Sequence, residues 1–355
     1  MQKTKVLVLF GGQSGEHAVS IISAQSVCAA LNREKYDLRT LGITEQGRWY
    51  FGVRPEEWLT ADNGKGQAGA EVTLHLAPGS SGFMVLGGCG AAGVYRPDVV
   101  FPVLHGPRGE DGTVQGLLTL AELPFVGCGV LGGALGMDKD RAKAVFREAG
   151  LPVGPYLVLP AARRAEEALW RRIEEELGYP CFIKPASLGS SVGITKAATR
   201  AALRAGLDLA AAHDPKIVVE RQISGREIEI SVLGNDEPQA SVPGEIIPDG
   251  DFYDYEAKYV SAASRLIIPA PLPAALSERL RDYALRAFTA VAARGLGRVD
   301  FFVTAADEIY INEINTMPGF TGISMYPKLW AASGLPYESL LDRLIELALE
   351  TRGPI

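Results

Sequence analysis

Two short segments near the C-terminal end combine residue types that suit a divalent cation. Arg298-Val-Asp300 carries a guanidinium and a carboxylate, and Glu313-Ile-Asn315 carries a carboxylate and an amide. Residues two apart in a strand point to the same face, so Asp300, Glu313 and Asn315 would converge beside Arg298 if the strands pair. Such oxygen ligands suit Mg²⁺, which usually completes its shell with substrate phosphates. An ordinary ion pair on an exposed sheet face is the competing interpretation and carries equal weight.

A loop of small residues follows a lysine at the end of a predicted strand. The segment Lys184-Pro-Ala-Ser-Leu-Gly-Ser-Ser-Val-Gly193 offers backbone N–H groups and hydroxyls to phosphate oxygens, and the ammonium would offset their charge. It lacks the G-x-x-x-x-G-K-[ST] pattern of a Walker A loop. Taken alone, the segment is equally compatible with a flexible turn that exposes its lysine.

Two further segments suit a nucleotide and a lid. The predicted strand before Glu220 stops at an acid, so Glu220 to Ile223 and Glu227 could present backbone groups to adenine and a carboxylate to ribose. A solvated strand end is the favoured interpretation of that segment alone. Asp251 to Tyr259 is a charged, aromatic stretch between strands, and long loops of this kind often exclude water from a site. An edge hairpin is the alternative.

Glycine segments mark two other ligand candidates. Gly11-Gly-Gln-Ser-Gly-Glu16 lacks the G-x-G-x-x-G pattern, which disfavours a dinucleotide site, although the following helix N-terminus could still bind an anion. His17 and His105 each follow a predicted strand and could face a cleft. Gly319 would let the backbone approach a ligand closely and present its N–H.

The elements that must position these segments alternate between strand and helix. Val6 to Phe10 is an apolar run typical of a buried parallel strand, and an apolar helical stripe follows it. This rhythm predicts an open parallel sheet with ligand sites at the carboxyl ends of its strands. Residues 55–95 are rich in small residues and are predicted to be an insertion with weak structure of its own. We expect further strands at 38–43, 98–104, 125–128, 181–183, 217–219, 227–233, 297–304 and 308–315, and helices around 142–149 (with Asp138 as N-cap), 169–177, 280–291 and 337–349.

Composition restricts the class of protein. The 355 residues suggest two or three domains at roughly 150 residues each. With 47% hydrophobic and 22% charged residues, the chain is not a disordered one. A net charge of −7 without a basic block argues against nucleic-acid binding, and no apolar run reaches the roughly 18 residues of a membrane span. The four cysteines are far apart and form no C-x-x-C pair, so reduced thiols in a cytoplasmic protein are expected rather than disulfides or zinc.

Eight motifs in order along residues 5 to about 350 carry a resemblance to a known family. The chain resembles the D-alanine–D-alanine ligase family of the ATP-grasp superfamily. The motifs are Phe10-Gly-Gly-Gln-Ser-Gly-Glu-His17, His105-Gly-Pro-Arg-Gly-Glu-Asp-Gly112, Met137-Asp-Lys139, Ile183-Lys-Pro185, Gly189-Ser-Ser-Val-Gly193, Phe252-Tyr-Asp-Tyr-Glu-Ala-Lys-Tyr259, Gly297-Arg-Val-Asp300 and Asn312-Glu-Ile-Asn-Thr-Met-Pro-Gly319.

The resemblance implies an α/β and α+β fold, a three-domain ATP-grasp architecture with an N-terminal parallel-sheet (Rossmann-like) domain. The implied divisions are residues 1–130 for substrate binding, 131–220 for the central ATP-grasp subdomain, and 221–355 for the C-terminal domain with the metal site and lid. Two Mg²⁺ ions, with Mn²⁺ as a substitute, would be held by Asp300, Glu313 and Asn315. The implied ATP contacts are Lys139, Lys184, Ser187, Ser191, Val192, Glu220, Arg221, Ile223 and Glu227.

The implied activity is ATP-dependent ligation of two D-alanines through an acyl phosphate, for peptidoglycan precursors. Arg298 and the N–H of Gly319 would stabilise the tetrahedral oxyanion. Glu16 would bind the ammonium of the first D-alanine, with His105 nearby, and Ser324 and Met325 would line the second subsite. Glu16, Ser190 and Tyr259 would form a latch that closes the lid, and Lys258 would help to order it.

Four alternatives remain beside this interpretation. A D-alanine–D-lactate ligase would be expected to have a histidine in the lid loop and to lack the Lys-Tyr pair. Residues 245–270 contain no histidine and Lys258-Tyr259 is present, so this alternative is disfavoured. D-serine as the second substrate stays open, since a hydroxyl changes affinity only modestly in an unspecialised pocket. A dinucleotide-dependent oxidoreductase would leave the metal segments and the lid unexplained, and a noncatalytic nucleotide-binding module would be expected to lack one of the four polar residues at 298–315. The resemblance also implies a cytoplasmic homodimer.

Overall fold

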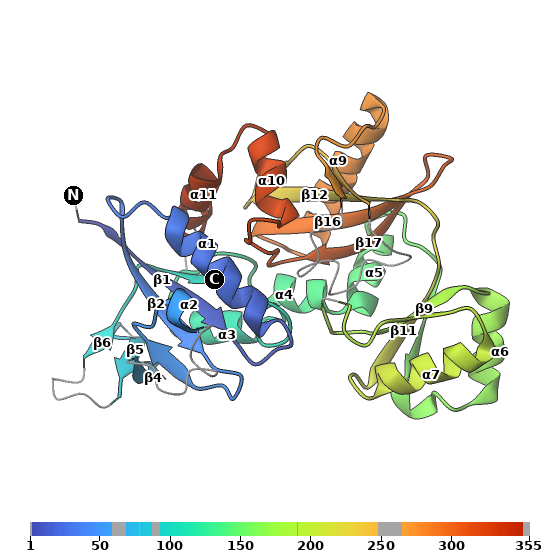
Figure 1. Cartoon of the computed structure of the whole chain (residues 1–355), viewed down its shortest axis with the longest axis horizontal. Coiled ribbons are helices and arrows are strands. Elements are labelled where there is room, and N and C mark those ends of the chain that lie inside the picture. The colour runs from blue at the N-terminus through green and yellow to red at the C-terminus, as the bar shows by residue number, and fades with distance from the viewer. Residues whose placement is uncertain are drawn as a thin grey trace.

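The strands form three separate sheets within the part of the chain that the computed structural model describes, namely residues 2–58, 69–77, 79–86, 93–189, 191–247 and 265–350 (Figure 1). One sheet with a parallel centre and two antiparallel sheets, connected by helices, agree with the α/β and α+β class expected from the sequence. Each sheet comes from one continuous stretch of chain. The domain divisions at residues 130 and 220 stay a prediction.

The N-terminal sheet has the strand order β6-β5-β4-β3-β2-β1-β7. Its centre is parallel, because β1 pairs in parallel with both β2 and β7, as predicted. The apolar side chains of β1 pack against the buried stripe of α1 in one core. Its elements are β1 (Thr4–Gly11), α1 (His17–Ala30), β2 (Tyr36–Ile43), β3 (Trp49–Phe51), α2 (Pro55–Trp58), β4 (Ala70–His75), β5 (Gly82–Val85), β6 (Val94–Tyr95), β7 (Val99–Pro102) and α3 (Thr113–Leu120).

Two predictions for this sheet are wrong. The described parts of residues 55–95 are not a weakly structured insertion, because β4, β5 and β6 extend the sheet by antiparallel pairing. Val72 and Phe83 are buried there, and Phe83 stacks on Trp49. The expected strand at 125–128 is reduced to one isolated bridge between Phe125 and Val100.

The central sheet has the order β10-β9-β11-β8 and is antiparallel. The predicted N-cap is confirmed, since the Asp138 side chain accepts a hydrogen bond from the N–H of Arg141 at the start of α5. The elements from residue 130 to the end of this sheet are α4 (Val130–Met137), α5 (Lys139–Glu148), β8 (Tyr156–Pro160), the short 3₁₀ helix η2 (Ala161–Arg163), α6 (Glu167–Glu176), β9 (Cys181–Pro185), β10 (Thr195–Ala197), α7 (Arg200–Ala211) and β11 (Lys216–Arg221).

The C-terminal sheet has the order β15-β14-β12-β16-β17, with β13 paired to β12. Helix α9 packs its buried face on this sheet in one core. The elements are β12 (Arg226–Gly234), β13 (Gln239–Ala240), β14 (Gly244–Ile247), β15 (Arg265–Ile267), α9 (Ala274–Ala290), β16 (Gly295–Val303), β17 (Ile309–Asn315), α10 (Met325–Ala332) and α11 (Tyr337–Glu350).

The end of the chain returns to its beginning. Helix α11 lies beside α1, and buried side chains of both join the core of the N-terminal sheet (Figure 1). Asp342 on α11 accepts hydrogen bonds from Lys35 (2.6 Å) and from the hydroxyl of Tyr36 (2.7 Å). These contacts fix the C-terminal sheet relative to the N-terminal one, and the candidate site lies where the sheets meet. None of the described helices is both long and apolar enough to cross a membrane.

Candidate active site

The paired strands β16 and β17 bring the predicted metal ligands together. Their register sets Arg298 opposite Asn315 and Asp300 opposite Glu313, so the pairing expected from the sequence is confirmed. Arg298 donates to both oxygens of Asp300, through Nε and Nη2, at 2.8 Å each. Asn315 Nδ2 donates to Asp300 Oδ2 at 2.9 Å. The two strands therefore present a compact group of carboxylate, amide and guanidinium side chains on one face.

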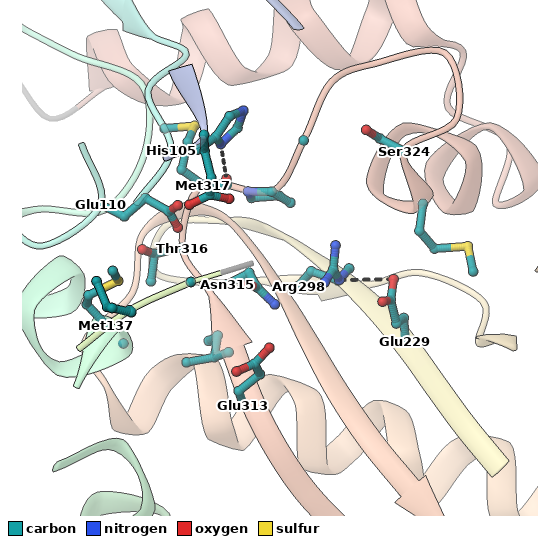
Figure 2. A pocket seen from close by; sticks show the side chains of 18 of the residues that line it. His105, Glu110, Met137, Glu229, Arg298, Glu313, Asn315, Thr316, Met317 and Ser324 are labelled. Carbon is teal, nitrogen blue, oxygen red and sulfur yellow. Dashed lines mark hydrogen bonds and ion pairs between the residues drawn. The ribbon is translucent and has the colours of Figure 1, made fainter. Parts of the chain in front are cut away.

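Glu229 on β12 is a site residue that sequence reasoning missed. It lies opposite Asp300 in the strand register, and its Oε2 atom is 3.0 Å from Arg298 Nε (Figure 2). The signal was present in the sequence, because Glu229 follows the predicted Glu227 by two residues and so shares its face of the strand.

Arg298 and Asn315 open onto a small pocket of ≈ 80 Å³. Glu16 reaches this pocket from the start of α1, and its carboxylate is buried. A Cβ built on Gly189 would lie 3.0 Å from Glu16 Oε2, so this carboxylate lies next to the small-residue loop after β9. The predicted substrate residues that line this pocket are Glu16, His105, Arg298, Gly319, Ser324 and Met325.

His105 holds one wall of the small pocket by hydrogen bonds. Its Nδ1 lies 3.1 Å from the carbonyl oxygen of Met317 and its Nε2 lies 3.4 Å from the hydroxyl of Ser23. A carbonyl only accepts, so Nδ1 carries the proton and Nε2 accepts from Ser23. Burial lowers the pKa of His105, although the Glu16 carboxylate and the Met317 carbonyl oppose that effect. His105 is therefore a neutral side chain that ties β7 to the loop after β17. The other predicted histidine, His17, is buried beneath the N-terminal loop with Nδ1 2.7 Å from the Gly12 carbonyl and does not line either pocket.

Glu110 is a second missed residue, although it belongs to the motif that begins at His105. Its Oε1 accepts a hydrogen bond from the N–H of Gly106 at 2.7 Å, and it lines the small pocket beside Glu16. Burial and the charge of Glu16 raise the pKa of Glu110 to about 8, against backbone hydrogen bonds that favour its ionised form. Figure 2 shows Glu110, His105 and Met317 together on one side of the pocket, with Ser324 on the other.

The second side of the small pocket is the N-terminus of α10. Ser324 is the N-cap residue of this helix, and its hydroxyl accepts from the N–H of Thr321 at 3.0 Å. Met325 follows and is buried. A Cβ built on Gly319 would lie 2.7 Å from Ser324 Oγ, so the backbone at Gly319 passes directly beside that hydroxyl. Backbone N–H groups at a helix start favour a carboxylate, and this end of the pocket offers them.

A large pocket of ≈ 580 Å³ lies on the other side of Lys139 and Glu313. Ile223 packs on Gly154 in its wall, since a Cβ on that glycine would lie 2.6 Å from Ile223 Cδ1. The predicted nucleotide or metal residues that line it are Lys139, Lys184, Ser191, Glu220, Arg221, Ile223, Glu227, Asp300 and Glu313. Ser187 and Val192 are not among its lining residues.

Lys184 is paired inside the large pocket. Its Nζ donates to Glu220 Oε2 at 2.6 Å. Burial alone would lower the pKa of Lys184, but the Glu220 and Glu313 carboxylates raise it above its ordinary value. Burial would likewise raise the pKa of Glu220, yet the charges of Lys143 and Lys184 hold it at about 2. Both groups are therefore ionised at neutral pH.

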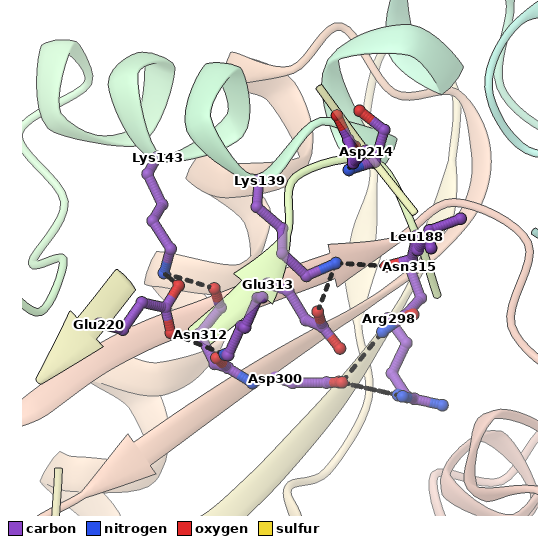
Figure 3. A network of polar contacts seen from close by, with 12 residues as sticks. Lys139, Lys143, Leu188, Asp214, Glu220, Arg298, Asp300, Asn312, Glu313 and Asn315 are labelled. Carbon is purple, nitrogen blue, oxygen red and sulfur yellow. Dashed lines mark hydrogen bonds and ion pairs between the residues drawn. The ribbon is translucent and has the colours of Figure 1, made fainter. Parts of the chain in front are cut away.

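Lys139 and Asp214 hold the loop that follows β9. Lys139 donates through Nζ to the carbonyl of Leu188 at 2.5 Å and lies 3.8 Å from Glu313 Oε2 (Figure 3). Asp214 Oδ2 accepts from the N–H of Ser187 at 2.8 Å. The start of the loop is thus fixed by backbone contacts, with Ser187 turned toward Asp214.

The guanidinium of Arg221 binds the end of α6. Its Nε and Nη2 donate to the carbonyls of Leu177 (2.9 Å) and Glu176 (2.7 Å) at the end of α6, where a cation is favourable. Two of its three guanidinium nitrogens are therefore held at the end of α6.

Three of the predicted residues and the lid lie outside the described residues: Ser190, Lys258, Tyr259 and the whole of residues 248–264. The latch of Glu16, Ser190 and Tyr259 stays a prediction. Within the described ranges, no group of three or more His, Cys, Asp or Glu side chains forms a candidate metal centre. The set at Asp300, Glu313 and Asn315 has two carboxylates and one amide.

The two pockets meet along a common boundary. Lys139, Leu188, Gly189, Glu229 and Glu313 line both of them. A polyphosphate in the large pocket and a small zwitterion in the small pocket would therefore meet at this boundary. Such an arrangement suits transfer of a phosphoryl group from one to the other.

Two protein-family models match the chain. The model described as "D-ala D-ala ligase N-terminus" matches residues 5–128, and "D-ala D-ala ligase C-terminus" matches residues 145–346. Among curated proteins, the D-alanine–D-alanine ligase of Ruminiclostridium cellulolyticum is 51% identical over 365 residues, covering 99% of this chain and 96% of the relative. The D-alanine–D-alanine ligase of Heliobacterium modesticaldum is 51% identical over 352 residues, covering 98% and 95%.

Solved structures agree with the sequence matches. The D-alanine–D-alanine ligase from Coxiella burnetii superposes with a TM-score of 0.84 at 39% identity and covers 98% of this chain and 96% of its own. A D-Ala:D-Ser ligase from Enterococcus faecalis superposes with a TM-score of 0.87 at 39% identity and covers 98% and 100%.

Proposed function

The chain belongs to the D-alanine–D-alanine ligase family, and from this premise we propose that it joins two D-alanines into D-alanyl-D-alanine with ATP as the phosphoryl donor. The family's enzymes are ATP-dependent ligases, so the chain is an ATP-using enzyme of the ATP-grasp class. The proposal assigns the large pocket to ATP, the small pocket to the amino acids, and the product to peptidoglycan precursor synthesis.

The boundary between the two pockets carries this proposal. ATP bound with its adenine near Ile223 and Glu227 would extend its phosphates toward Lys184 and Lys139. Since Lys139 and Glu313 also line the small pocket, the γ-phosphate would face the carboxylate of an amino acid held there. Ser187, Ser191 and Val192 belong to the loop that would cover the phosphates.

The residues at the boundary fit a divalent cation. Asp300, Glu313 and Asn315 offer the oxygen donors that Mg²⁺ prefers. Six carboxylates and five cationic side chains are found among the described residues that line the large pocket, so the protein alone does not neutralise a bound polyphosphate. Two Mg²⁺ ions, or Mn²⁺ in their place, would supply the missing charge and polarise the phosphate oxygens.

The chemistry needs activation because a carboxylate is a poor electrophile. Its oxygen attacks the γ-phosphorus, ADP leaves, and an acyl phosphate forms. The amine of the second D-alanine then attacks the carbonyl carbon, and phosphate leaves from the tetrahedral intermediate. Arg298 and the N–H of Gly319 line the place where that oxyanion develops, and one such donor typically contributes about 3 kcal/mol.

The amino acids would bind by their charges. Glu16 would pair with the ammonium of the first D-alanine, with the neutral His105 fixing the wall behind it. Ser324 and the start of α10 would bind the carboxylate of the second, and Met325 would contact its methyl group. Ser190, Lys258 and Tyr259 would close the lid and exclude water, which protects an acyl phosphate from hydrolysis. A homodimer, a cytoplasmic location, and the domain divisions at 130 and 220 are proposed with the same assignment.

A second candidate uses D-serine as the amine substrate. One of the similar structures is a D-Ala:D-Ser ligase, with a TM-score of 0.87. A hydroxyl on the substrate is rejected only weakly by a pocket that is not built against it. D-Serine is therefore tested directly beside D-alanine.

The test is phosphate release from MgATP with D-alanine alone and with D-alanine plus D-serine or D-lactate, with products identified by mass. D-Alanyl-D-alanine from D-alanine alone is the expected result. Turnover only after D-serine or D-lactate is added would replace the proposal with the corresponding sister activity. Arg298→Met should lower the rate by about 100-fold. Arg294→Met is the matched control, since Arg294 is an exposed residue paired with Asp236.

A further inference from the structure

Helix α5 carries two buried lysines one turn apart. Lys139 lies at the pocket boundary, and Lys143 follows it by four residues on the same face. The side chain of Lys143 is 5% exposed. An ammonium group removed from water must be compensated by a charge or by hydrogen bonds. Neither the motifs nor the assignment of the pockets gives Lys143 a role.

The compensation comes from two other elements. Lys143 Nζ lies 3.0 Å from Glu220 Oε1 on β11 and donates to the carbonyl of Asn312 on β17 at 3.0 Å (Figure 3). The other oxygen of Glu220 accepts from Lys184 on β9. One carboxylate thus bridges two lysines, and Lys143 joins α5 to both the central and the C-terminal sheets across the large pocket.

This bridge changes the charge that Lys184 presents. With Glu220 as its single partner at 2.6 Å, Lys184 would be a neutralised ion pair. Burial lowers the pKa of Lys143, although the Glu220 carboxylate opposes that effect. When Lys143 is protonated, its ammonium shares the Glu220 carboxylate, so the charge of Lys184 is only partly neutralised. This second ammonium also gives Glu220 a partner that stays in place if Lys184 turns toward a phosphate.

We propose that Lys143 is a positioning residue for nucleotide binding, which acts by holding Glu220 so that the Lys184 ammonium is available to the polyphosphate. The inference rests on the proposed assignment of the large pocket to ATP. It concerns equilibrium binding of the nucleotide and not the ligation step itself.

The experiment measures the Kd of MgATP by calorimetry in the absence of D-alanine. Lys143→Met should raise this Kd by about 10-fold or more, in line with the loss of a hydrogen bond between charged groups. The KM for D-alanine should stay unchanged, which separates the effect from a general distortion. Lys143→Arg keeps the charge and should restore most of the affinity. Arg147→Met is the control on the same helix, since Arg147 is exposed and lies over the Tyr156 ring.

A double-substitution cycle tests the route through Glu220. If Lys143 acts through this carboxylate, Lys143→Met should change the Kd by less than about twofold in a Glu220→Gln background. This comparison also serves if Lys143→Met alone does not fold, because the double variant removes Lys143 together with the carboxylate that it compensates, while the amide oxygen of the glutamine can still accept from Lys184. An unchanged Kd in folded Lys143→Met, or a full loss that persists in the Glu220→Gln background, would overturn the proposal.

Failure of the inference about Lys143 can be distinguished from failure of the proposed ligase function. A protein that binds MgATP and responds to Lys143→Met but makes no dipeptide would keep the inference and reject the ligase assignment. An unsubstituted protein that binds no MgATP would reject both.

Discussion

The carboxylate of Glu229 lies 3.0 Å from the guanidinium of Arg298, across the pairing of β12 with β16. Arg298 is also held by both oxygens of Asp300. Asp300 is a proposed metal ligand, so its oxygens would be needed elsewhere when a cation binds. Glu229 is then the partner that continues to fix the direction of Arg298.

We therefore expect Glu229→Gln to lower kcat by about 10-fold, a part of the effect of losing an oxyanion donor, with little change in the KM for ATP. The measurement is steady-state phosphate release at saturating MgATP and varied D-alanine. Glu174→Gln is a control that breaks an Arg–Glu pair on the surface of α6, with Arg200. Equal kcat values for the Glu229→Gln variant and the unsubstituted protein would contradict a role for Glu229 in orienting Arg298.

Gly319 and Gly322 form a matched pair in the loop before α10. A Cβ on Gly319 would lie 2.7 Å from Ser324 Oγ, whereas a Cβ on Gly322 would meet nothing within 4 Å. Gly319→Ala should displace the Ser324 hydroxyl and raise the KM of the second D-alanine by about 10-fold, as expected for a lost hydrogen bond to a carboxylate. Gly322→Ala should leave that KM unchanged. Two variants with the same KM would argue that Ser324 does not contact the substrate.

Asp214 provides a test of the loop after β9. It is buried, and its two oxygens accept from the N–H groups of Ser187 and Lys216 at 2.8 Å each. Asp214→Ala should lower the free energy of unfolding by about 1–3 kcal/mol, because two partly buried N–H groups lose their acceptor. It should also weaken MgATP binding, since the loop start is released. Asp208→Ala, at an exposed side chain of α7, is the control for both measurements by denaturant titration and calorimetry.

The raised pKa of Glu110 predicts that the free energy of unfolding falls as pH rises. Its pKa is raised from 4.5 to about 8 by burial and by Glu16. Between these pH values the folded protein holds a proton that the unfolded chain releases, so this carboxyl makes the free energy of unfolding fall as pH rises. The slope from one group is at most about 1.4 kcal/mol per pH unit.

Glu110→Gln should remove that contribution, and its stability relative to the unsubstituted protein should increase from pH 5 to pH 8. Guanidinium unfolding at each pH unit measures the difference. A difference that is constant with pH would show that Glu110 is ionised in the folded state at neutral pH.

The motif-bearing strands were predictable because their signals are local. The apolar run at Val6 to Phe10, the alternation of Arg298 with Asp300 and the cap at Asp138 each depend on neighbouring residues. The segment at 55–95 was misjudged for the same reason. Its short antiparallel strands are stabilised by pairing with β3, and small residues give a weak periodic signal.

The contacts that the site residues make were harder to predict from the sequence. Residues 110, 143 and 229 each lie near a motif, at spacings that place them on the same loop or face as a predicted residue. Nothing in the sequence gives the atoms that they contact. Lys143 contacts Glu220, which is 77 residues away in the sequence, and the carbonyl of Asn312, which is 169 residues away. Such contacts depend on the tertiary fold.

Residue type and short-range spacing were enough to predict the residues of the proposed site, because local patterns indicate a strand face, a phosphate loop and a helix cap. How these groups are paired depends on the tertiary fold. The return of α11 to α1 and the meeting of three sheets bring Glu16 beside Gly189 and His105 beside Met317. The pairing of β12 with β16 brings Glu229 beside Arg298. Those pairings set charge and orientation at the site through distances that no local pattern encodes.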